Sequence, residues 1–327
     1  MKRRVLITCP HLQRSIEHYR DLFAQHEVEI EAPPCVQPLN EAELEAIIGE
    51  YDGVIAGDDE FSASVLERAR NLKVLVKWGI GVDAIDLAAA RRRGIPVFNT
   101  PGVFAEEVAD VVLGYIIILA RQLQRVDREV RAGGWPKVEG VSLRGKMLGV
   151  IGLGSIGGAV ARRGAALGMR LVGCDVAPVA RACAETPGLR LADLREVVST
   201  ADFLSLNCNL TRSNRHLLGK REFDLMRPGI YLINTARGGL IDERALIDAL
   251  EKGTVAGAAL DVFEDEPLPA GSPLRRFESC VFGAHNASNA REAVTRVNEL
   301  AIEVLLTELD EPGGRRDLTD GLVSIDA

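Results

Sequence analysis

The chain has 327 residues, of which 47% are hydrophobic, 26% are charged and 5% are aromatic. At about 100 to 200 residues per domain, this length predicts two domains, and the composition excludes collagen-like, disordered and fibrous proteins. Asp and Glu outnumber Lys and Arg by 47 to 39. The resulting net charge of −8 repels a phosphate backbone, so we expect no nucleic-acid partner.

The cysteines and the apolar runs indicate the compartment. The six cysteines, at positions 9, 35, 174, 183, 208 and 280, have no CxxC or metal-ligand spacing. We therefore expect buried thiols, no metal ion and a cytoplasmic protein. Too few apolar residues follow the basic start of the chain for a signal peptide. The longest apolar run, Val111–Ala120, is about half as long as a membrane span, so we expect no membrane partner.

Short runs rich in Val, Ile and Leu alternate with helix-like stretches in the N-terminal part of the chain. They predict strands at Val5–Thr8, Val28–Ile30, Gly53–Ala56, Val74–Lys77 and Pro96–Phe98. Such alternation is typical of a parallel sheet covered by helices. The spacing of Asn40 and Glu43 matches a capping box and predicts the start of a helix.

A long apolar pattern follows Pro101 and Gly102. It runs from Val103 to Arg131 and predicts one helix that ends at Gly133 and connects two domains.

A second series of apolar runs follows Gly145. It predicts strands at Leu148–Ile151, Arg170–Cys174, Phe203–Leu206, Ile230–Asn234, Gly257–Leu260 and Cys280–Phe282. The amphipathic stretch Arg291–Leu306 has no strand of its own, and we expect this helix to pack on the first domain.

A glycine motif opens the second series. Gly152-Leu153-Gly154-Ser155-Ile156-Gly157 follows the strand MLGVI directly and begins a helix-like stretch. In a dinucleotide-binding turn the first glycine permits the tight turn, the second lets a pyrophosphate approach the backbone, and the third packs helix against strand. Asp175, after the next strand, suits a ribose and would repel a 2′-phosphate, which predicts NAD rather than NADP. The alternative is a glycine turn without a ligand.

Three further segments carry a charged or titratable side chain just past a predicted strand. Arg237 follows a buried strand, where ligands of open sheets bind, and its guanidinium suits a carboxylate. Leu260 runs into an acidic segment, of which we expect Glu264 and Asp265 to form a solvated loop. His285 closes the last strand and suits proton exchange. Singly, Arg237 also fits a surface arginine and His285 a structural histidine; together they favour an active site.

At this point the sequence resembles a known family. VIGLGSIG, NTARGGLIDERAL, ALDVFEDEP and then His285 resemble the NAD-dependent D-2-hydroxyacid dehydrogenases, which include phosphoglycerate, glyoxylate/hydroxypyruvate and phosphite dehydrogenases. KWGIGVDAID and RRRGIPVFNTPG extend the match over the first domain. The resemblance implies an enzyme that transfers a hydride between nicotinamide and C2 of a small 2-hydroxy or 2-oxo acid.

The resemblance also implies roles for particular residues. Arg237 would bind the substrate carboxylate, His285 would be the acid/base, and Glu266 would orient His285. The implied cofactor contacts beyond the glycine motif and Asp175 are Asn207, Cys208, Thr235, Ala236 and Asp261, the last of these at the nicotinamide carboxamide. The implied substrate-binding residues of the first domain are Lys77, Gly79, Ile80 and Gly81. Members of this family are typically homodimers built around the long helix.

The chain departs from the family pattern around the expected substrate. His285-Asn286-Ala287-Ser288-Asn289 replaces His-Ile-Gly-Ala-Thr, Phe104 replaces an asparagine, and Asn207 and Asn209 replace His and Pro. Lys77 favours an anionic substrate tail, whereas Gly57-Asp58-Asp59 and Phe104 favour a small acid such as hydroxypyruvate or glyoxylate over a phosphorylated one.

Other functions remain open. Phosphoglycerate or phosphite oxidation would use the same three catalytic residues, and an NADH-sensing regulatory protein could share the fold. Glu266 argues against formate oxidation, because the related formate enzymes have a glutamine there.

The predicted fold class is α/β, with two doubly wound parallel sheets. We expect a discontinuous, flavodoxin-like substrate domain at 1–101 plus 289–327 and a Rossmann NAD-binding domain at 102–288.

Overall fold

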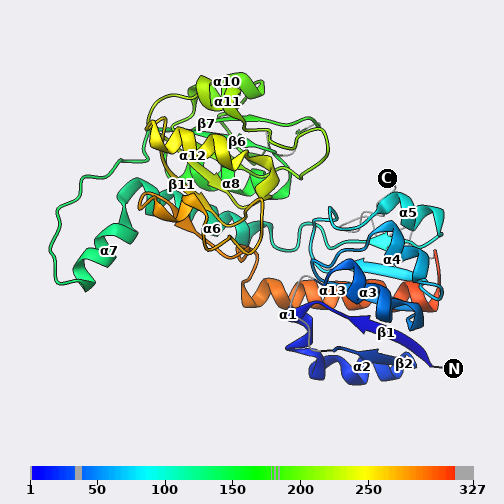
Figure 1. The fold of residues 1–327 in the computed structure, drawn as a ribbon. Helices are drawn as coiled ribbons and strands as arrows, with labels where there is room; N and C mark the ends of the chain where they lie inside the picture. Colours follow the sequence, from blue (N-terminus) through cyan, green and yellow to red (C-terminus); the bar gives the residue numbers. More distant parts are fainter. Residues whose placement is uncertain (1, 34–38, 178, 180–181, 183–184, 314–327) are drawn as a thin grey trace. The chain divides into compact units, whose positions relative to one another are not determined.

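The computed structural model describes residues 2–33, 39–177, 179, 182 and 185–313, and the chain divides into two compact units (Figure 1). The first unit comprises Met1–Phe104 and Ala290–Ala327, and the second comprises Ala105–Asn289. Of the six cysteines, Cys35 and Cys183 lie outside the described residues. The other four are free thiols: Cys9, Cys174, Cys208 and Cys280.

The first unit is built on a parallel sheet of five strands in the order β2-β1-β3-β4-β5. The strands are β1 Arg3–Ile7, β2 Val28–Glu31, β3 Gly53–Ala56, β4 Val74–Lys77 and β5 Val97–Phe98. All five predicted strands are present, with small differences at their ends. This strand order is that of flavodoxin-like folds, so the predicted class is confirmed for this unit.

Helices cover this sheet. They are α1 Pro10–Gln13, α2 Arg20–Gln25, α3 Glu41–Ile47, α4 Ala63–Arg68, α5 Leu87–Arg92 and α13 Arg291–Asp310. The predicted capping box starts α3: the Glu43 N–H donates to Asn40 Oδ1 at 3.1 Å, and the Asn40 N–H donates to Glu43 Oε2 at 3.0 Å. As predicted, α13 packs on the first unit, where it lies against β3 and β4.

The second unit is built on a parallel sheet of seven strands in the order β12-β11-β10-β9-β6-β7-β8. The strands are β6 Met147–Ile151, β7 Arg170–Cys174, β8 Leu189–Leu191, β9 Phe203–Leu206, β10 Ile230–Asn234, β11 Val255–Leu260 and β12 Val281–Phe282. Strand order reverses at β6, the place where dinucleotides bind in doubly wound sheets. Among the described strands, only the edge strand β8 was not predicted, because its three residues are mostly exposed and leave no apolar run.

The helices of the second unit are α6 Ala105–Arg121, α7 Leu123–Arg131, α8 Ser155–Ala166, α10 Leu194–Thr200, α11 Lys220–Leu225 and α12 Glu243–Glu251. The prediction of one helix up to Arg131 is wrong, because Gln122 adopts a left-handed conformation (φ 52°, ψ 40°) between α6 and α7. The burial of the side chains also changes at Gln122. Helix α6 packs on α8, β10 and β11, whereas α7 has no buried residue. No helix in the described ranges has both the length and the apolar character to span a membrane.

Candidate active site

The glycine turn between β6 and α8 has the shape that a pyrophosphate requires. Gly152 has φ +85°, and a Cβ atom there would lie 2.6 Å from the backbone nitrogen of Cys208. A Cβ atom on Gly157 would collide with the carbonyl oxygen of Gly152, whereas one on Gly154 would have no neighbour within 4 Å. No side chain of the described residues caps α8, whose first N–H groups are free to bind an anion. The turn therefore fits a dinucleotide.

Asp175 lies beside this turn. Its Oδ2 atom accepts a hydrogen bond from the Leu153 N–H at 2.6 Å, and its Oδ1 atom accepts one from the Ala177 N–H at 2.9 Å. These bonds fix the carboxylate and leave it lone pairs for a ribose hydroxyl. Burial raises the pKa of the nearby Cys174 and Cys208 thiols to about 11, so both are neutral at physiological pH.

The turn after β10 carries three of the expected site residues. Asn234 is fully buried, accepts from the Ala236 N–H at 3.0 Å and donates to the carbonyl oxygen of Arg237 at 2.9 Å. Between them, Thr235 Oγ1 is buried and has no hydrogen-bond partner among the described residues. Such an atom suits a polar group of a bound cofactor. Asn207 and Cys208 follow β9, the next strand of the same sheet.

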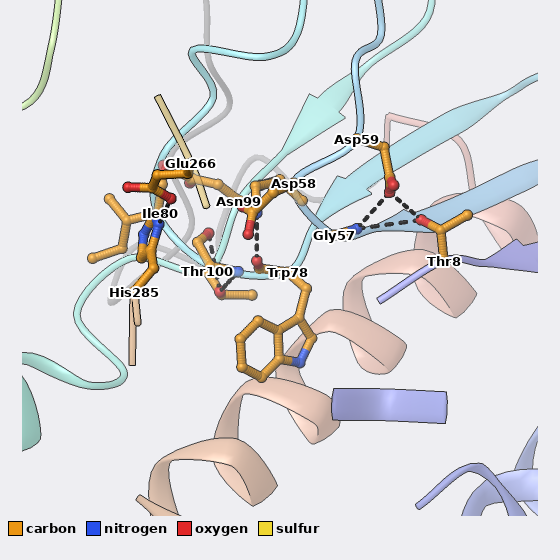
Figure 2. Close-up of polar contacts among 12 residues, drawn as sticks. Thr8, Gly57, Asp58, Asp59, Trp78, Ile80, Asn99, Thr100, Glu266 and His285 are labelled. Carbon is orange, nitrogen blue, oxygen red and sulfur yellow. Dashed lines mark hydrogen bonds and ion pairs between the residues drawn. The ribbon is translucent and has the colours of Figure 1, made fainter. Parts of the chain in front are cut away.

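The three expected catalytic residues follow the neighbouring strands β10, β11 and β12. Because these strands are parallel, Arg237, Glu266 and His285 lie past the same edge of the sheet. His285 Nδ1 lies 2.8 Å from Glu266 Oε2 (Figure 2). The other oxygen of Glu266 accepts from the Phe263 N–H at 2.9 Å, which fixes the carboxylate. A Cβ atom on Gly238 would collide with the backbone of Phe263, so the Arg237 turn packs directly on the loop of Glu266.

Asp261 holds the backbone of His285. His285 has φ +53°, a left-handed conformation that costs a residue with a Cβ atom about 1 to 2 kcal/mol. The His285 N–H donates to the carbonyl oxygen of Asp261 at 2.7 Å. Asp261 Oδ2 also accepts from the N–H groups of Asn286 and Ala287, at 2.9 and 2.8 Å. Asp261 is thus a positioning residue for the histidine.

Two further residues, Tyr115 and Gly283, lie against the carboxylate of Asp261. Tyr115 OH lies 3.4 Å from Asp261 Oδ1, and burial together with that carboxylate raises the tyrosine pKa to about 12. Tyr115 therefore keeps its proton. A Cβ atom on Gly283 would collide with Asp261 Oδ1, so glycine is required there. The segment that departs from the family pattern after His285 contacts Asp261 through the backbone N–H groups of Asn286 and Ala287, which any residue other than proline would also supply.

The expectation of a solvated acidic loop is wrong for Glu264, although Asp265 is exposed. Glu264 Oε2 accepts from the Glu243 N–H at 3.3 Å, and the Glu264 N–H donates to Glu243 Oε1 at 2.8 Å. Arg215 and His216 also contact the Glu264 carboxylate. The cause is the start of α12 at Glu243, which leaves an N–H group in need of an acceptor. Sequence reasoning missed this contact because the two glutamates are far apart in the chain.

The expected substrate loop lies in the first unit. Gly79 has φ +113°, its N–H donates to Thr100 Oγ1 at 2.9 Å, and its carbonyl oxygen accepts from the Thr100 N–H at 2.9 Å. Asn99 Nδ2 donates to the carbonyl oxygen of Ile80 at 2.8 Å (Figure 2). Sequence reasoning assigned no role to Asn99 and Thr100, although the segment FNTPG that contains them is part of the family match.

Lys77 is buried next to this loop. Its Nζ atom donates to Asp58 Oδ1 at 2.9 Å and to the carbonyl oxygen of Trp78 at 2.8 Å. In the sequence, Lys77 favours an anionic substrate tail and Asp58 disfavours one. The structure joins them in one ion pair.

A glycine turn that fits a dinucleotide, together with Arg, Glu and His past one edge of the same sheet, is the arrangement expected of a nicotinamide-dependent dehydrogenase. Residues 113–287 match the family model described as D-isomer specific 2-hydroxyacid dehydrogenase, NAD binding domain. The chain belongs to this family. The predicted family, its NAD cofactor and its hydride transfer to or from C2 of small 2-hydroxy or 2-oxo acids are thereby confirmed.

The relatives that this chain matches are named for different substrates. A glyoxylate reductase of Thermofilum pendens is 38% identical over 257 residues, which cover 77% of this chain and 76% of that protein. A D-3-phosphoglycerate dehydrogenase of Archaeoglobus fulgidus is 34% identical over 92% of this chain, which covers 56% of that protein. The crystal structure of D-lactate dehydrogenase from Aquifex aeolicus, complexed with NAD and lactic acid, is 25% identical with a TM-score of 0.85, and the match covers 94% of this chain and 96% of that one.

The position of Asp175 predicts discrimination between cofactors. We expect NADH to bind at least tenfold more tightly than NADPH, about 1.4 kcal/mol, because a 2′-phosphate would face this carboxylate. Asp175→Ser should narrow the difference, whereas Asp224→Ser, which removes an exposed carboxylate on α11, should not. Fluorescence titration with both cofactors measures the ratio, and equal wild-type affinities would contradict the assignment.

Proposed function

We propose that the chain reduces a small, singly charged 2-oxo acid such as hydroxypyruvate or glyoxylate, and that Arg237, Glu266 and His285 are its catalytic residues. The observation that carries this proposal is the 2.8 Å contact between His285 Nδ1 and Glu266 Oε2 past the strand edge that also bears Arg237. When bound, NADH would supply a hydride from C4 of its nicotinamide in reduction, and NAD+ would accept one there in oxidation.

The proposed mechanism uses the geometry of the three side chains. A carboxylate accepts but does not donate hydrogen bonds, so Glu266 holds the proton of His285 on Nδ1, and Nε2 is the nitrogen that would exchange a proton with the substrate. In reduction, protonated Nε2 donates its proton to the carbonyl oxygen as negative charge develops there; in oxidation, neutral Nε2 takes the hydroxyl proton. Arg237 binds the substrate carboxylate with two hydrogen bonds and polarises the carbonyl group. Glu266 stabilises the imidazolium.

We propose binding roles for the remaining site residues. The cofactor-binding residues are Gly152, Gly154, Ser155, Ile156, Gly157, Asp175, Asn207, Cys208, Thr235, Ala236 and Asp261. The partnerless hydroxyl of Thr235 supports its inclusion. Asp261 would meet the nicotinamide carboxamide with the lone pairs that its backbone contacts leave unused. The substrate-binding residues of the first unit are Lys77, Gly79, Ile80 and Gly81, together with Arg237 of the second.

The names of the relatives leave two substrate classes open, phosphorylated and unphosphorylated acids. A phosphate dianion usually requires more than one cation. Because Lys77 is already paired with Asp58, the first unit favours an acid without a phosphate group.

A panel of 2-oxo acids tests the proposed reaction. With purified protein and NADH, we expect absorbance loss at 340 nm with hydroxypyruvate or glyoxylate. His285→Ala should lower kcat by about 10² to 10⁴ because the positioned proton donor is lost, and NADH binding should persist. His18→Ala, which removes an exposed histidine of the first unit, should keep the wild-type rate. Lack of NADH consumption with every acid, or a fully active His285→Ala, would refute the proposal.

The Glu266 contact predicts a change in pH dependence. Reduction requires protonated His285, and the Glu266 carboxylate favours that form, so activity declines as pH rises and the proton is lost. Glu266→Gln removes this charge, and the decline in kcat/KM for reduction should begin at lower pH. An unshifted pH profile with normal NADH affinity would exclude Glu266 from the mechanism.

We further propose a cytoplasmic homodimer in which 1–101 plus 289–327 bind the substrate and 102–288 bind NAD. Apolar side chains on and just beyond α7 support the dimer, because this helix buries no residue within its own chain. The exposed fractions are 45% for Leu123, 42% for Val130 and 78% for Trp135. Exposed apolar clusters of this kind mark protein interfaces.

Light scattering measures the oligomeric state. We expect a dimer at micromolar concentration, and we expect the double variant Leu123→Glu/Val130→Glu to be a monomer, because it places charges on the apolar face. Leu191→Glu on β8, at a position that is 50% exposed, should remain a dimer. A monomeric wild-type protein would contradict this proposal.

A further inference from the structure

The side chain of Lys77 ends at the Gly79–Gly81 loop. Its Nζ atom lies 3.7 Å from the position of a Cβ atom on Gly79, and 7% of the side chain is exposed. Two of the three N–H groups of the ammonium donate to Asp58 and to the carbonyl oxygen of Trp78. A ligand on this loop therefore experiences the charge of Lys77 together with that of Asp58.

The pair has no net charge. A buried ammonium group is strongly unfavourable unless a carboxylate accompanies it, so Asp58 permits the burial of Lys77. A second anion could gain the full attraction of Lys77 only by displacing Asp58. The Asp58 side chain is itself 64% exposed, so an approaching anion also meets its negative charge.

Asp59 fixes the turn that carries Asp58. Asp59 is 1% exposed, and its carboxylate accepts from the Leu39 and Gly57 N–H groups, both at 3.0 Å, and from the Thr8 hydroxyl group. Figure 2 shows Asp59 joined to Thr8 and Gly57. These bonds tie the turn to the end of β1, so Asp58 has little freedom to move away from Lys77.

We propose that Asp58 is a specificity-determining residue, which restricts the enzyme to 2-oxo acids that carry a single negative charge. This inference rests on the proposed role of the Gly79–Gly81 loop in substrate binding. A phosphate group on the substrate would add two negative charges near the Asp58 carboxylate. The positive charge of Lys77 would not compensate for them, because Asp58 already offsets it. Glyoxylate has a hydrogen atom, and hydroxypyruvate a hydroxymethyl group, in place of the phosphorylated tail. Neither group is charged, so Asp58 does not repel it.

The test compares hydroxypyruvate with 3-phosphohydroxypyruvate. The measured quantity is the ratio of kcat/KM for the phosphorylated acid to kcat/KM for the unphosphorylated acid, with saturating NADH. We expect a wild-type ratio below one. Asp58→Asn keeps the size of the side chain and unmasks the charge of Lys77, so the ratio should rise at least tenfold, chiefly through a lower KM for the phosphorylated acid.

The chain offers a matched control at the opposite end of the same strands. Asp52 precedes β3, Lys73 precedes β4, and Asp52 Oδ1 lies 3.0 Å from Lys73 Nζ. Asp52→Asn makes the same charge change in another Asp–Lys pair. We expect its ratio to stay within about twofold of wild type, because water and salt screen a charge this far from the loop.

The outcomes separate this inference from the proposed function. Wild-type reduction of hydroxypyruvate with an unchanged ratio in Asp58→Asn would refute the role of Asp58 and leave the proposed function intact. A wild-type preference for the phosphorylated acid would also refute it and would make Lys77 a phosphate ligand. Failure to reduce any 2-oxo acid would overturn the proposed function, and this inference with it.

A second measurement requires no variant. Raising the salt concentration from about 20 to about 300 mM shortens the screening length severalfold, which weakens the repulsion between Asp58 and a phosphate group. We therefore expect the wild-type ratio to increase with salt. A ratio that falls with salt would mean net attraction of the phosphate group and would refute the proposal.

Discussion

The position of His285 depends on one buried residue, Asp261. Its carbonyl oxygen accepts from the His285 N–H, and one carboxylate oxygen accepts from the N–H groups of Asn286 and Ala287. Because Asp261 is only 2% exposed, these bonds are shielded from water and hold the histidine in its left-handed conformation. The contact between His285 and Glu266 requires this backbone geometry, since a rotation of the backbone would redirect the imidazole.

The second constraint is steric: at four positions a neighbouring atom lies so close that only glycine, which has no Cβ atom, fits. Gly152 and Gly157 bring the dinucleotide turn against the end of β9 and the start of α8, and Gly238 brings the Arg237 turn against the Glu266 loop. Gly283 leaves room for the carboxylate of Asp261. At each position a Cβ atom would overlap a neighbouring atom, so the Gly152–Gly157 turn and the loops that carry Arg237, Glu266 and His285 depend on the same steric condition.

Much of this arrangement could be predicted from local patterns. Apolar runs of strand length predicted eleven of the twelve strands that the structure describes, because buried parallel strands are almost continuously hydrophobic. The glycine motif predicted the turn at Gly152–Gly157, because each glycine has its own steric reason. The placement of Arg237, Glu266 and His285 past neighbouring strands followed from a general property of parallel sheets, whose strands end at a common edge. Asp261 was expected only at the cofactor, since its contacts to the backbone of the His285 segment are not visible in a local pattern.

The sequence by itself therefore determined the alternation of strands and helices, the cofactor turn and the family, because these depend on residues close together in the chain. The tertiary structure decided which distant charges meet. Lys77 pairs with Asp58, 19 positions away, and Glu264 accepts from the start of α12. The tertiary structure also decided that the buried helix α6 ends before Gln122. The next helix, α7, has no buried residue. Contacts between such distant residues depend on how the fold brings strands and loops together, and composition and periodicity do not predict this arrangement.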